Sequence, residues 1–191
     1  ISPSVVTYGG RSTITGYIKS YGGRAIYDEA VSVQRMYPGG SWATIGSVRS
    51  SSTGRLSYSF FPGRKAYYRF YHPRSAKYVS RLSTYRTVLV RASLGAPGAP
   101  RQAHHTWPFF SIGTVAPDHA QGTPVYMQCC HYESGRWVLR KLITMRLSSS
   151  GSSWSGQVTL PYSGEWRIRQ YMAADGRHVG SYSAWRYVSC E

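Results

Sequence analysis

Short runs in which apolar and polar residues alternate recur along the first ninety positions. Side chains two apart on a strand share a face, so Val31 and Val33 are expected to face one side of a strand. Pro38-Gly39-Gly40 and Pro62-Gly63 separate neighbouring runs, as turn residues do. The segments with this pattern are 12–18, 30–35, 42–45, 54–60, 66–71 and 87–90. No segment holds a 3.6-residue period, so the pattern predicts an all-β fold.

The second half of the chain repeats the first. The pairs offset by 100 residues are Arg69 and Arg169, Tyr71 and Tyr171, Val79 and Val179, Ser83 and Ser183, Arg86 and Arg186, and Val88 and Val188. Upstream the offset shrinks in small steps, for example where Gly40-Ser41-Trp42 matches Gly135-Arg136-Trp137. The steps fall where Gly, Ser and Pro cluster, as loop insertions between two copies of one fold would.

Each copy has about the length of an immunoglobulin-type sandwich, for which about 100 residues is usual. We therefore predict two tandem Ig-like β-sandwich domains, at residues 1–92 and 104–191. Residues 93–103 contain the run Leu94-Gly95-Ala96-Pro97-Gly98-Ala99-Pro100, whose composition is typical of a short semi-extended linker.

The order of motifs in both copies resembles a known group of domains. The first copy carries Thr15-Gly16, Val31-Ser32-Val33-Gln34, Gly40-Ser41-Trp42, Gly54-Arg55-Leu56 and Tyr68-Arg69-Phe70-Tyr71. The second carries Ile112-Gly113, Val125-Tyr126-Met127-Gln128, Gly135-Arg136-Trp137 and Trp166-Arg167-Ile168-Arg169-Gln170-Tyr171. This order is similar to the Ig-like tandem repeats common on secreted and cell-surface proteins of bacteria, especially actinobacteria. The resemblance implies a β-sandwich fold and an extracellular location, but domains of this group serve as spacers, adhesin modules, enzyme appendages and filament subunits.

The charge of the chain is strongly positive, with 23 Lys and Arg against 7 Asp and Glu and a net charge of +16. Nineteen of the cations are Arg, which suits bidentate recognition of carboxylate, phosphate or sulfate groups. Compositional drift in a GC-rich genome explains the same bias without a ligand. No apolar run reaches the 18 residues of a membrane span. The start at Ile1 fits either a removed secretory signal or trimming of a longer chain.

Three cysteines are present, Cys129, Cys130 and Cys190. In an oxidising compartment we expect Cys190 to form a disulfide with Cys129 or Cys130; the alternative is three buried free thiols. No Cys or His spacing typical of a zinc site occurs, and the pair His104-His105 has no further ligands beside it. We expect neither a metal nor a cofactor.

Groups suited to catalysis are few. Only Asp28 and Glu29 among the seven carboxylates are close in sequence, and the matching positions of the second copy, Gly122-Thr123, hold no acid. A nucleophile built from Cys130 and His131 is disfavoured, because adjacent strand residues point to opposite faces. The sequence therefore predicts a protein that is not an enzyme.

Arginines interleaved with aromatic residues are the candidate binding residues. They are Arg64, Tyr67, Arg69, Tyr71 and Arg74 in the first copy and Trp166, Arg167, Arg169 and Tyr171 in the second. Rings on an exposed sheet face stack on sugars or bases, and Arg holds anionic groups. Alternatively, one alternate set belongs to the core and the Arg stems merely cover aromatic faces at the surface.

These features together predict a non-catalytic extracellular structural or adhesive protein. It would assemble with itself into a surface layer or filament, or bind an anionic cell-surface polymer or polysaccharide. The alternative is an accessory cell-wall or polysaccharide-binding module of a secreted hydrolase. Nucleic acid is a poor candidate partner, since no DNA- or RNA-binding motif accompanies the positive charge.

Overall fold

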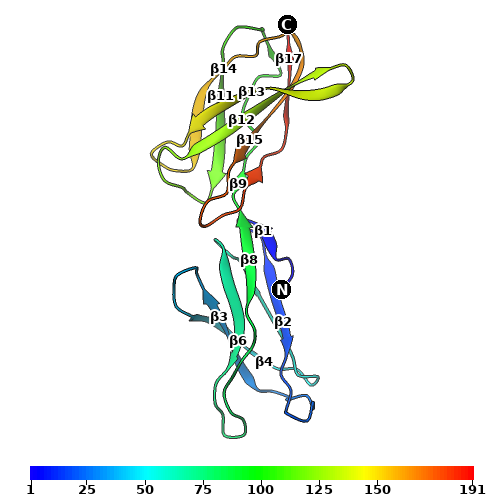
Figure 1. Ribbon diagram of the computed structural model, residues 1–191, viewed down its shortest axis with the longest axis vertical. Helices are drawn as coiled ribbons and strands as arrows, with labels where there is room; N and C mark the ends of the chain where they lie inside the picture. The colour runs from blue at the N-terminus through cyan, green and yellow to red at the C-terminus, as the bar shows by residue number, and fades with distance from the viewer. The chain divides into compact units, whose positions relative to one another are not determined.

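A computed structural model describes all 191 residues, and its regular elements are all β-strands. The chain divides into two compact units: unit 1 comprises Ile1–Arg91 with Gly176–His178, and unit 2 comprises Ala92–Asp175 with Val179–Glu191. Figure 1 shows the strands of each unit. No helix long and apolar enough to cross a membrane is present.

Unit 1 is a sandwich of two sheets. Its strands are β1 (Val5–Thr7), β2 (Ser12–Tyr17), β3 (Ala30–Met36), β4 (Ala43–Arg49), β5 (Arg55–Phe60), β6 (Ala66–His72), β7 (Arg81–Leu82) and β8 (Arg86–Arg91). One sheet has the order β1-β8-β6-β3-β4, with β7 paired to β6, and the other contains β2 and β5. The two-residue alternation of β6 explains the packing: Ala66, Tyr68 and Phe70 are buried between the sheets, whereas Tyr67 and Arg69 are only partly buried.

Unit 2 repeats this arrangement with longer strands. They are β9 (Ser93–Leu94), β10 (Gln102–Ala103), β11 (Phe109–Ala116), β12 (Pro124–Glu133), β13 (Arg136–Arg146), β14 (Ser153–Val158), β15 (Gly164–Met172), β16 (Ser181–Tyr182) and β17 (Arg186–Cys190). The larger sheet has the order β10-β17-β15-β12-β13, with β16 paired to β15, and the smaller one has the order β14-β11-β9.

Equivalent details recur in both units. The first strand of each larger sheet, β1 or β10, runs parallel to the last, β8 or β17. Before that last strand, Ser83 Oγ accepts a hydrogen bond from the Phe70 N–H at 2.9 Å, and Ser183 Oγ accepts one from the Gln170 N–H at 3.0 Å. This strand order is that of an Ig-like sandwich, so the predicted fold class, two tandem Ig-like domains, is confirmed.

The segment predicted to be a linker, residues 93–103, instead belongs to the second sandwich. Its ends form β9 and β10, which pair with β11 and β17. Between them Gly98 accepts a hydrogen bond from Ser111 Oγ at 2.7 Å and donates its N–H to Ile112 O at 2.8 Å. Proline is tolerated here because the segment lies at sheet edges, where one side of the backbone needs no partner. The two units therefore divide between Arg91 and Ala92, without a separate linker.

The core of unit 2 contains a buried polar pair that unit 1 lacks. Gln170 Oε1 accepts a hydrogen bond from Trp154 Nε1 at 2.7 Å, and Gln170 Nε2 donates to Thr114 O at 3.0 Å and to Gly95 O. Trp154 stands opposite Gly113 in the β11–β14 pair, as Leu56 stands opposite Gly16 in the β2–β5 pair. Trp154 and Gln170 thus take the places of Leu56 and Phe70.

We expect Gly113→Ala to destabilise unit 2 by about 1–3 kcal/mol, the usual cost of overpacking a core. A Cβ atom at Gly113 would contact three ring atoms of the Trp154 indole, which is 2% exposed and held by Gln170. Gly180→Ala is the matched control, since a Cβ there meets only ordinary van der Waals contacts. Denaturant unfolding followed by circular dichroism measures both, and equal stabilities would contradict the packing described.

Candidate functional site

The outer face of the larger sheet in unit 2 is built by the alternation of β15. Trp166, Ile168 and Gln170 are 0% exposed and face the core, whereas Arg167 and Arg169 are partly exposed on the opposite face. Trp166 was one of the predicted binding residues. The structure places it in the core, with its indole N–H donating to Tyr162 O at 2.9 Å, so its side chain offers no binding surface.

On this outer face arginines and aromatic rings form a continuous stack. The Arg167 guanidinium lies 4.8 Å from the ring of Trp137 and 4.2 Å from that of Trp185. The Arg169 guanidinium lies 4.2 Å from the ring of Trp185 and 4.0 Å from that of Tyr182. Trp185 is therefore shared by both cations. Such cation–π contacts hold planar groups face to face.

Further rings extend the stack at both ends. Tyr182 stacks on Tyr171 at 4.6 Å between ring centroids, and Tyr171 lies 6.1 Å from Tyr126. At the other end Trp137 lies 5.1 Å from Tyr132. We call this set the arginine–aromatic ladder; its members are Tyr126, Tyr132, Trp137, Arg167, Arg169, Tyr171, Tyr182 and Trp185.

Strand register explains why the ladder forms. Tyr126, Tyr171 and Tyr182 stand opposite one another on β12, β15 and β16. Tyr132 and Trp137 are partners across the β12–β13 pair. Directly opposed aromatic residues are among the favourable cross-strand pairs, so the ladder also stabilises the sheet.

The ladder cations have no acidic partner. Arg169 donates its Nε–H to Gln128 Oε1 at 2.9 Å, and the buried Nε of Arg167 has no hydrogen-bond partner. Elsewhere Arg49 forms an ion pair with Asp28, and Arg140 forms one with Glu133. The positive charge of Arg167 and Arg169 is therefore uncompensated and oriented by rings, which suits an external anion.

Unit 1 carries a shorter version of the same feature. The Arg69 guanidinium lies 3.9 Å from the ring of Trp42 and donates its Nε–H to Gln34 Oε1 at 2.9 Å. Tyr85 lies 6.4 Å from Trp42 and 5.2 Å from Tyr67. Burial lowers the pKa of Arg69, but an arginine with so high an ordinary pKa stays protonated.

The other predicted residues of unit 1 lie outside this group. Arg64 stacks on Tyr37 at 3.8 Å, together with Arg35 at 4.5 Å on the same ring. Tyr71 is half-buried, and Arg74 is exposed in the loop after β6. The structure therefore brings together Tyr67 and Arg69 in unit 1, and Arg167, Arg169 and Tyr171 in unit 2.

Several ladder members were not among the predicted residues, notably Trp137, Tyr182 and Trp185. A signal for them was present. The repeat places Trp42 with Trp137, and Gln34 with Gln128, beside the matched arginines Arg69 and Arg169. The repeated Gln–Arg hydrogen bond forms in both copies. The tryptophan contacts Arg69 in unit 1, whereas in unit 2 Trp137 contacts Arg167 instead of Arg169.

The disulfide expected from Cys190 is absent, because Cys129, Cys130 and Cys190 are free and buried. Cys190 stands opposite Gly164 of β15, and Cys129 stands opposite Ile168 of the same strand. The two cysteines are thus offset by about 13 Å along the strands and about 10 Å across them. A disulfide needs Cα atoms within about 7 Å, so the alternative of buried thiols applies. Cys130 is offset by one residue less and is also out of reach.

We expect these thiols to be unreactive in the folded protein. Burial raises the pKa of Cys129 to about 12 and also raises the pKa of Cys190. At pH 8 only about one Cys129 in 10,000 is then a thiolate, which is the reactive form. A colorimetric thiol reagent should find almost no reaction in the native protein and three thiols per chain in guanidinium chloride. A count of one thiol after unfolding would reveal a disulfide instead.

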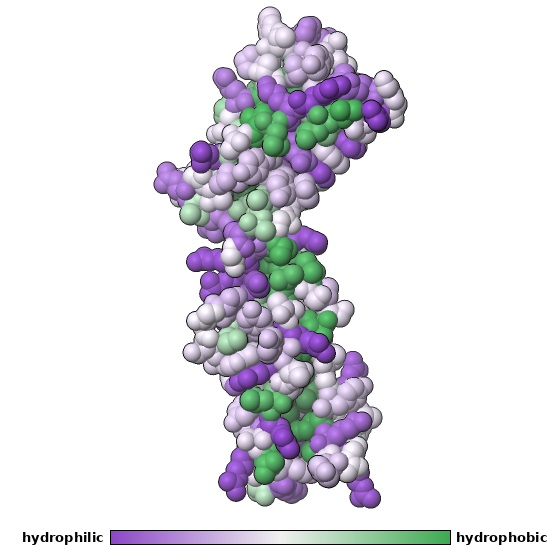
Figure 2. Space-filling model, in the orientation of Figure 1, coloured by the Kyte–Doolittle hydropathy of each residue, from purple (hydrophilic) through white to green (hydrophobic).

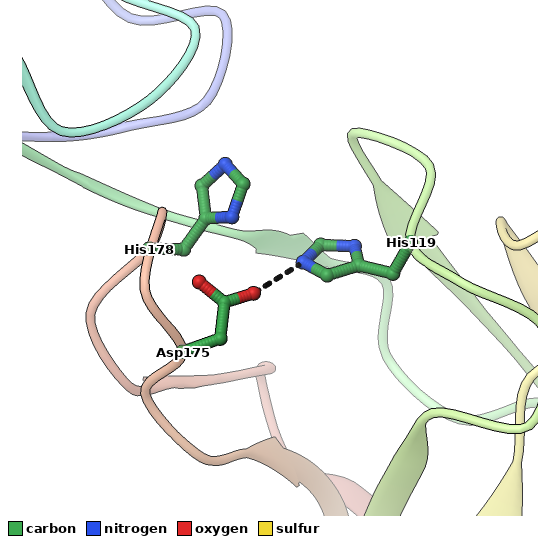
Figure 3. A group of neighbouring side chains, drawn as sticks. All are labelled: His119, Asp175 and His178. Carbon is green, nitrogen blue, oxygen red and sulfur yellow. Dashed lines mark ion pairs between the residues drawn. The ribbon is translucent and has the colours of Figure 1, made fainter. Parts of the chain in front are cut away.

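Several carboxylates are engaged in local hydrogen bonds or ion pairs. Glu29 accepts a hydrogen bond from His72, and Glu165 accepts one from Ser189 Oγ at 2.8 Å. In unit 2, Asp175 Oδ2 lies 3.4 Å from Nε2 of His119, whose Nδ1 faces Pro117 O at 2.7 Å (Figure 3). This ion pair connects the loop after β15 to the loop after β11.

The edge strand β13 exposes apolar side chains. Leu139 and Leu142 are 52% and 55% exposed, and β13 ends its sheet without a further partner strand. Figure 2 shows hydrophobic residues in small separate patches, including over the β12–β13 hairpin. The same strand carries four cations, Arg136, Arg140, Lys141 and Arg146. Pairing of two β13 strands would bring these like charges together, which is unfavourable.

Comparisons with known proteins add the following. No protein-family model matches the chain, and no curated protein matches its sequence. Among solved structures, the D0-D1 domain of intimin is similar with a TM-score of 0.37 and 11% identity, over 98% of this chain and 95% of that one.

Two further structures are similar at the same level. A C-terminal fragment of intimin in complex with the intimin-binding domain of the translocated intimin receptor has a TM-score of 0.46 and 11% identity, over 98% of this chain and 61% of that one. An ICAM-5 D1-D4 ectodomain fragment has a TM-score of 0.41 and 10% identity, over 99% of this chain and 51% of that one. The assignment to the Ig-like class rests on the strand order of each unit.

Proposed function

We propose that this chain is a non-catalytic extracellular adhesive module that binds an anionic polymer of a cell surface or cell wall through the arginine–aromatic ladder. The observation that carries the proposal is the placement of Arg167 and Arg169. Each lies between aromatic rings, and neither has a carboxylate partner.

The ladder offers both kinds of contact that an anionic polysaccharide needs. Sugar rings pack on aromatic faces, here those of exposed Tyr132 and Tyr182. The guanidinium fork of arginine suits carboxylate, phosphate or sulfate groups. A row of side chains along a sheet face suits an extended polymer, and the net charge of +16 attracts a polyanion before contact.

Binding of an anionic surface is favoured over self-assembly through the exposed strand edge. The β13 edge carries the four cations described above, so two copies would repel there. Attachment to a secreted hydrolase as an accessory module would use the ladder in the same way.

We also propose that the chain belongs to the Ig-like tandem repeats of bacterial, actinobacterial-type surface proteins. The proposal rests on the sequence motifs that resemble those repeats.

The experiment is retention of the protein on immobilised polygalacturonate across a salt series. The Debye length falls from about 20 Å at about 20 mM salt to about 4 Å at about 500 mM. We expect strong retention at low salt and elution as the salt rises, with a neutral dextran matrix as the control. Absence of retention at the lowest salt would contradict the proposal.

A further inference from the structure

Unit 1 contains a cavity of about 350 Å³ that is separate from the arginine–aromatic ladder. It lies between the two sheets, at the end where β2 leads into the loop 18–29 and β6 leads toward β7. A volume of this size is at the lower end of ligand pockets, for which about 300–1,000 Å³ is usual.

The floor of the cavity is apolar. Ile26, Leu56 and Phe70 line it and are each less than 9% exposed. The aromatic ring of Phe70 packs close to Gly16, where a Cβ atom would meet it at 3.0 Å. An apolar ring or branched aliphatic group would find contact on all sides of this floor.

Two residues that line the cavity, Leu56 and Phe70, differ between the two copies. In unit 2 the large indole of Trp154 takes the place of Leu56, and Gln170 takes the place of Phe70 and holds that indole. Unit 1 keeps the glycine that would accommodate an indole, Gly16, but carries the smaller Leu56 opposite it. In unit 1 the ring of Phe70 lies over Gly16 instead, and Leu56 and Phe70 together line the cavity.

The rim of the cavity is cationic and aromatic. Lys19 and Arg81 both line it, and no Asp or Glu does. Tyr17 and Tyr21 are exposed beside Lys19, whose Nζ lies 5.9 Å from the Tyr17 ring. Neither cation forms an ion pair with a carboxylate in the structure. The rim thus presents two positive charges above an apolar floor.

One wall is held in place by a buried histidine. His72, 5% exposed, places Nε2 3.1 Å from Glu29 Oε1 and Nδ1 3.3 Å from Val79 O. Both ring nitrogens have a partner, so the orientation of the ring is fixed. Glu29 is thereby turned to His72 and is not among the lining residues.

We propose that this cavity binds an apolar group of about one ring in size that carries a carboxylate, with the body on Ile26, Leu56 and Phe70 and the carboxylate between Lys19 and Arg81. Two sources share this chemistry: a free aromatic or aliphatic acid, and the C-terminal residue of a partner peptide. The proposal is independent of the ladder and of the polymer proposed to bind there.

The test measures binding of three probes to the whole chain by isothermal titration calorimetry and by NMR of the labelled protein. The probes are 3-phenylpropionate, a pentapeptide ending in Phe with a free carboxylate, and the same peptide amidated. We expect at least one of the two carboxylate probes to bind and the amidated peptide to bind at least tenfold more weakly than the free peptide. The stronger carboxylate probe then identifies the source.

The decisive variant is Leu56→Trp with Phe70→Gln, which installs in unit 1 the pair that unit 2 already accommodates. We expect it to fold and to lose binding of every probe, while Arg167→Gln with Arg169→Gln binds them as the wild type does. Arg81→Gln should weaken carboxylate binding about tenfold without filling the cavity, and it decides the question if the filled variant is unfolded. The proposal is overturned if the wild type binds neither carboxylate probe. It is also overturned if the folded Leu56→Trp/Phe70→Gln variant and Arg81→Gln both bind the probes as the wild type does.

Discussion

Replacement of Gln170 by Leu is expected to lower the free energy of unfolding of unit 2 by roughly 3–5 kcal/mol. The Gln170 side chain is 0% exposed and makes three hydrogen bonds, to Trp154 Nε1, Thr114 O and Gly95 O. Leucine can form none of these three hydrogen bonds. It leaves the buried indole N–H of Trp154 unsatisfied, which alone costs about 1–3 kcal/mol. Denaturant unfolding monitored by circular dichroism measures the loss.

The control uses the pair that unit 1 contains. Trp154→Leu together with Gln170→Phe removes the buried donor along with its acceptor. We expect this double variant to be more stable than the sum of the losses in Trp154→Leu alone and Gln170→Phe alone implies, by at least about 1 kcal/mol, because the residues contact each other directly. Additive losses would show that the hydrogen bond between Trp154 and Gln170 contributes nothing.

Replacement of both ladder arginines, Arg167→Gln with Arg169→Gln, is expected to weaken binding to polygalacturonate roughly 100-fold. This corresponds to the loss of two charge-assisted contacts of about 1.4 kcal/mol each. Arg167→Lys with Arg169→Lys keeps the charge but loses the planar fork, so we expect an intermediate affinity. Equilibrium binding at fixed low salt measures all three proteins.

A charge-matched control separates the ladder from net charge. Arg24→Gln with Arg55→Gln removes the same two charges from exposed positions outside the ladder. We expect it to lower affinity less than threefold. Equal losses in the two double variants would show that the polymer responds to overall charge and that the ladder is no specific site. Thermal melting of each variant checks that the fold is intact.

Most strands were predictable from alternation and turns. The expected segments 12–18, 30–35, 54–60, 66–71 and 87–90 correspond to β2, β3, β5, β6 and β8 within one or two residues. The residues 42–45, predicted to begin the return strand, lie at the start of β4, which runs to Arg49. The edge strands β9 and β10 lie in the segment predicted to be a linker, since proline and glycine mask strand signals where only one side of the backbone is paired.

The candidate site was predictable in part. The alternation of β15 puts Trp166 and Arg167 on opposite faces, because adjacent strand residues face opposite sides. The prediction of both as binding residues was therefore wrong for Trp166, which lies in the core. The stacking partners of Arg167 come from β13 and from the segment before β17, and only the sheet register brings them together. The cavity of unit 1 is lined by side chains from several strands and loops, which no periodicity brings together.

The most direct test of the central claim, that the ladder binds an anionic polymer, is a titration of the ¹⁵N-labelled protein with a galacturonic acid hexamer. The six tryptophans each provide one indole N–H signal. We predict that the signals of Trp137 and Trp185 shift, with a smaller shift for Trp42, whereas those of the core residues Trp154 and Trp166 stay in place. A titration in which the ladder signals stay fixed, or in which Trp107 alone shifts, would contradict the account.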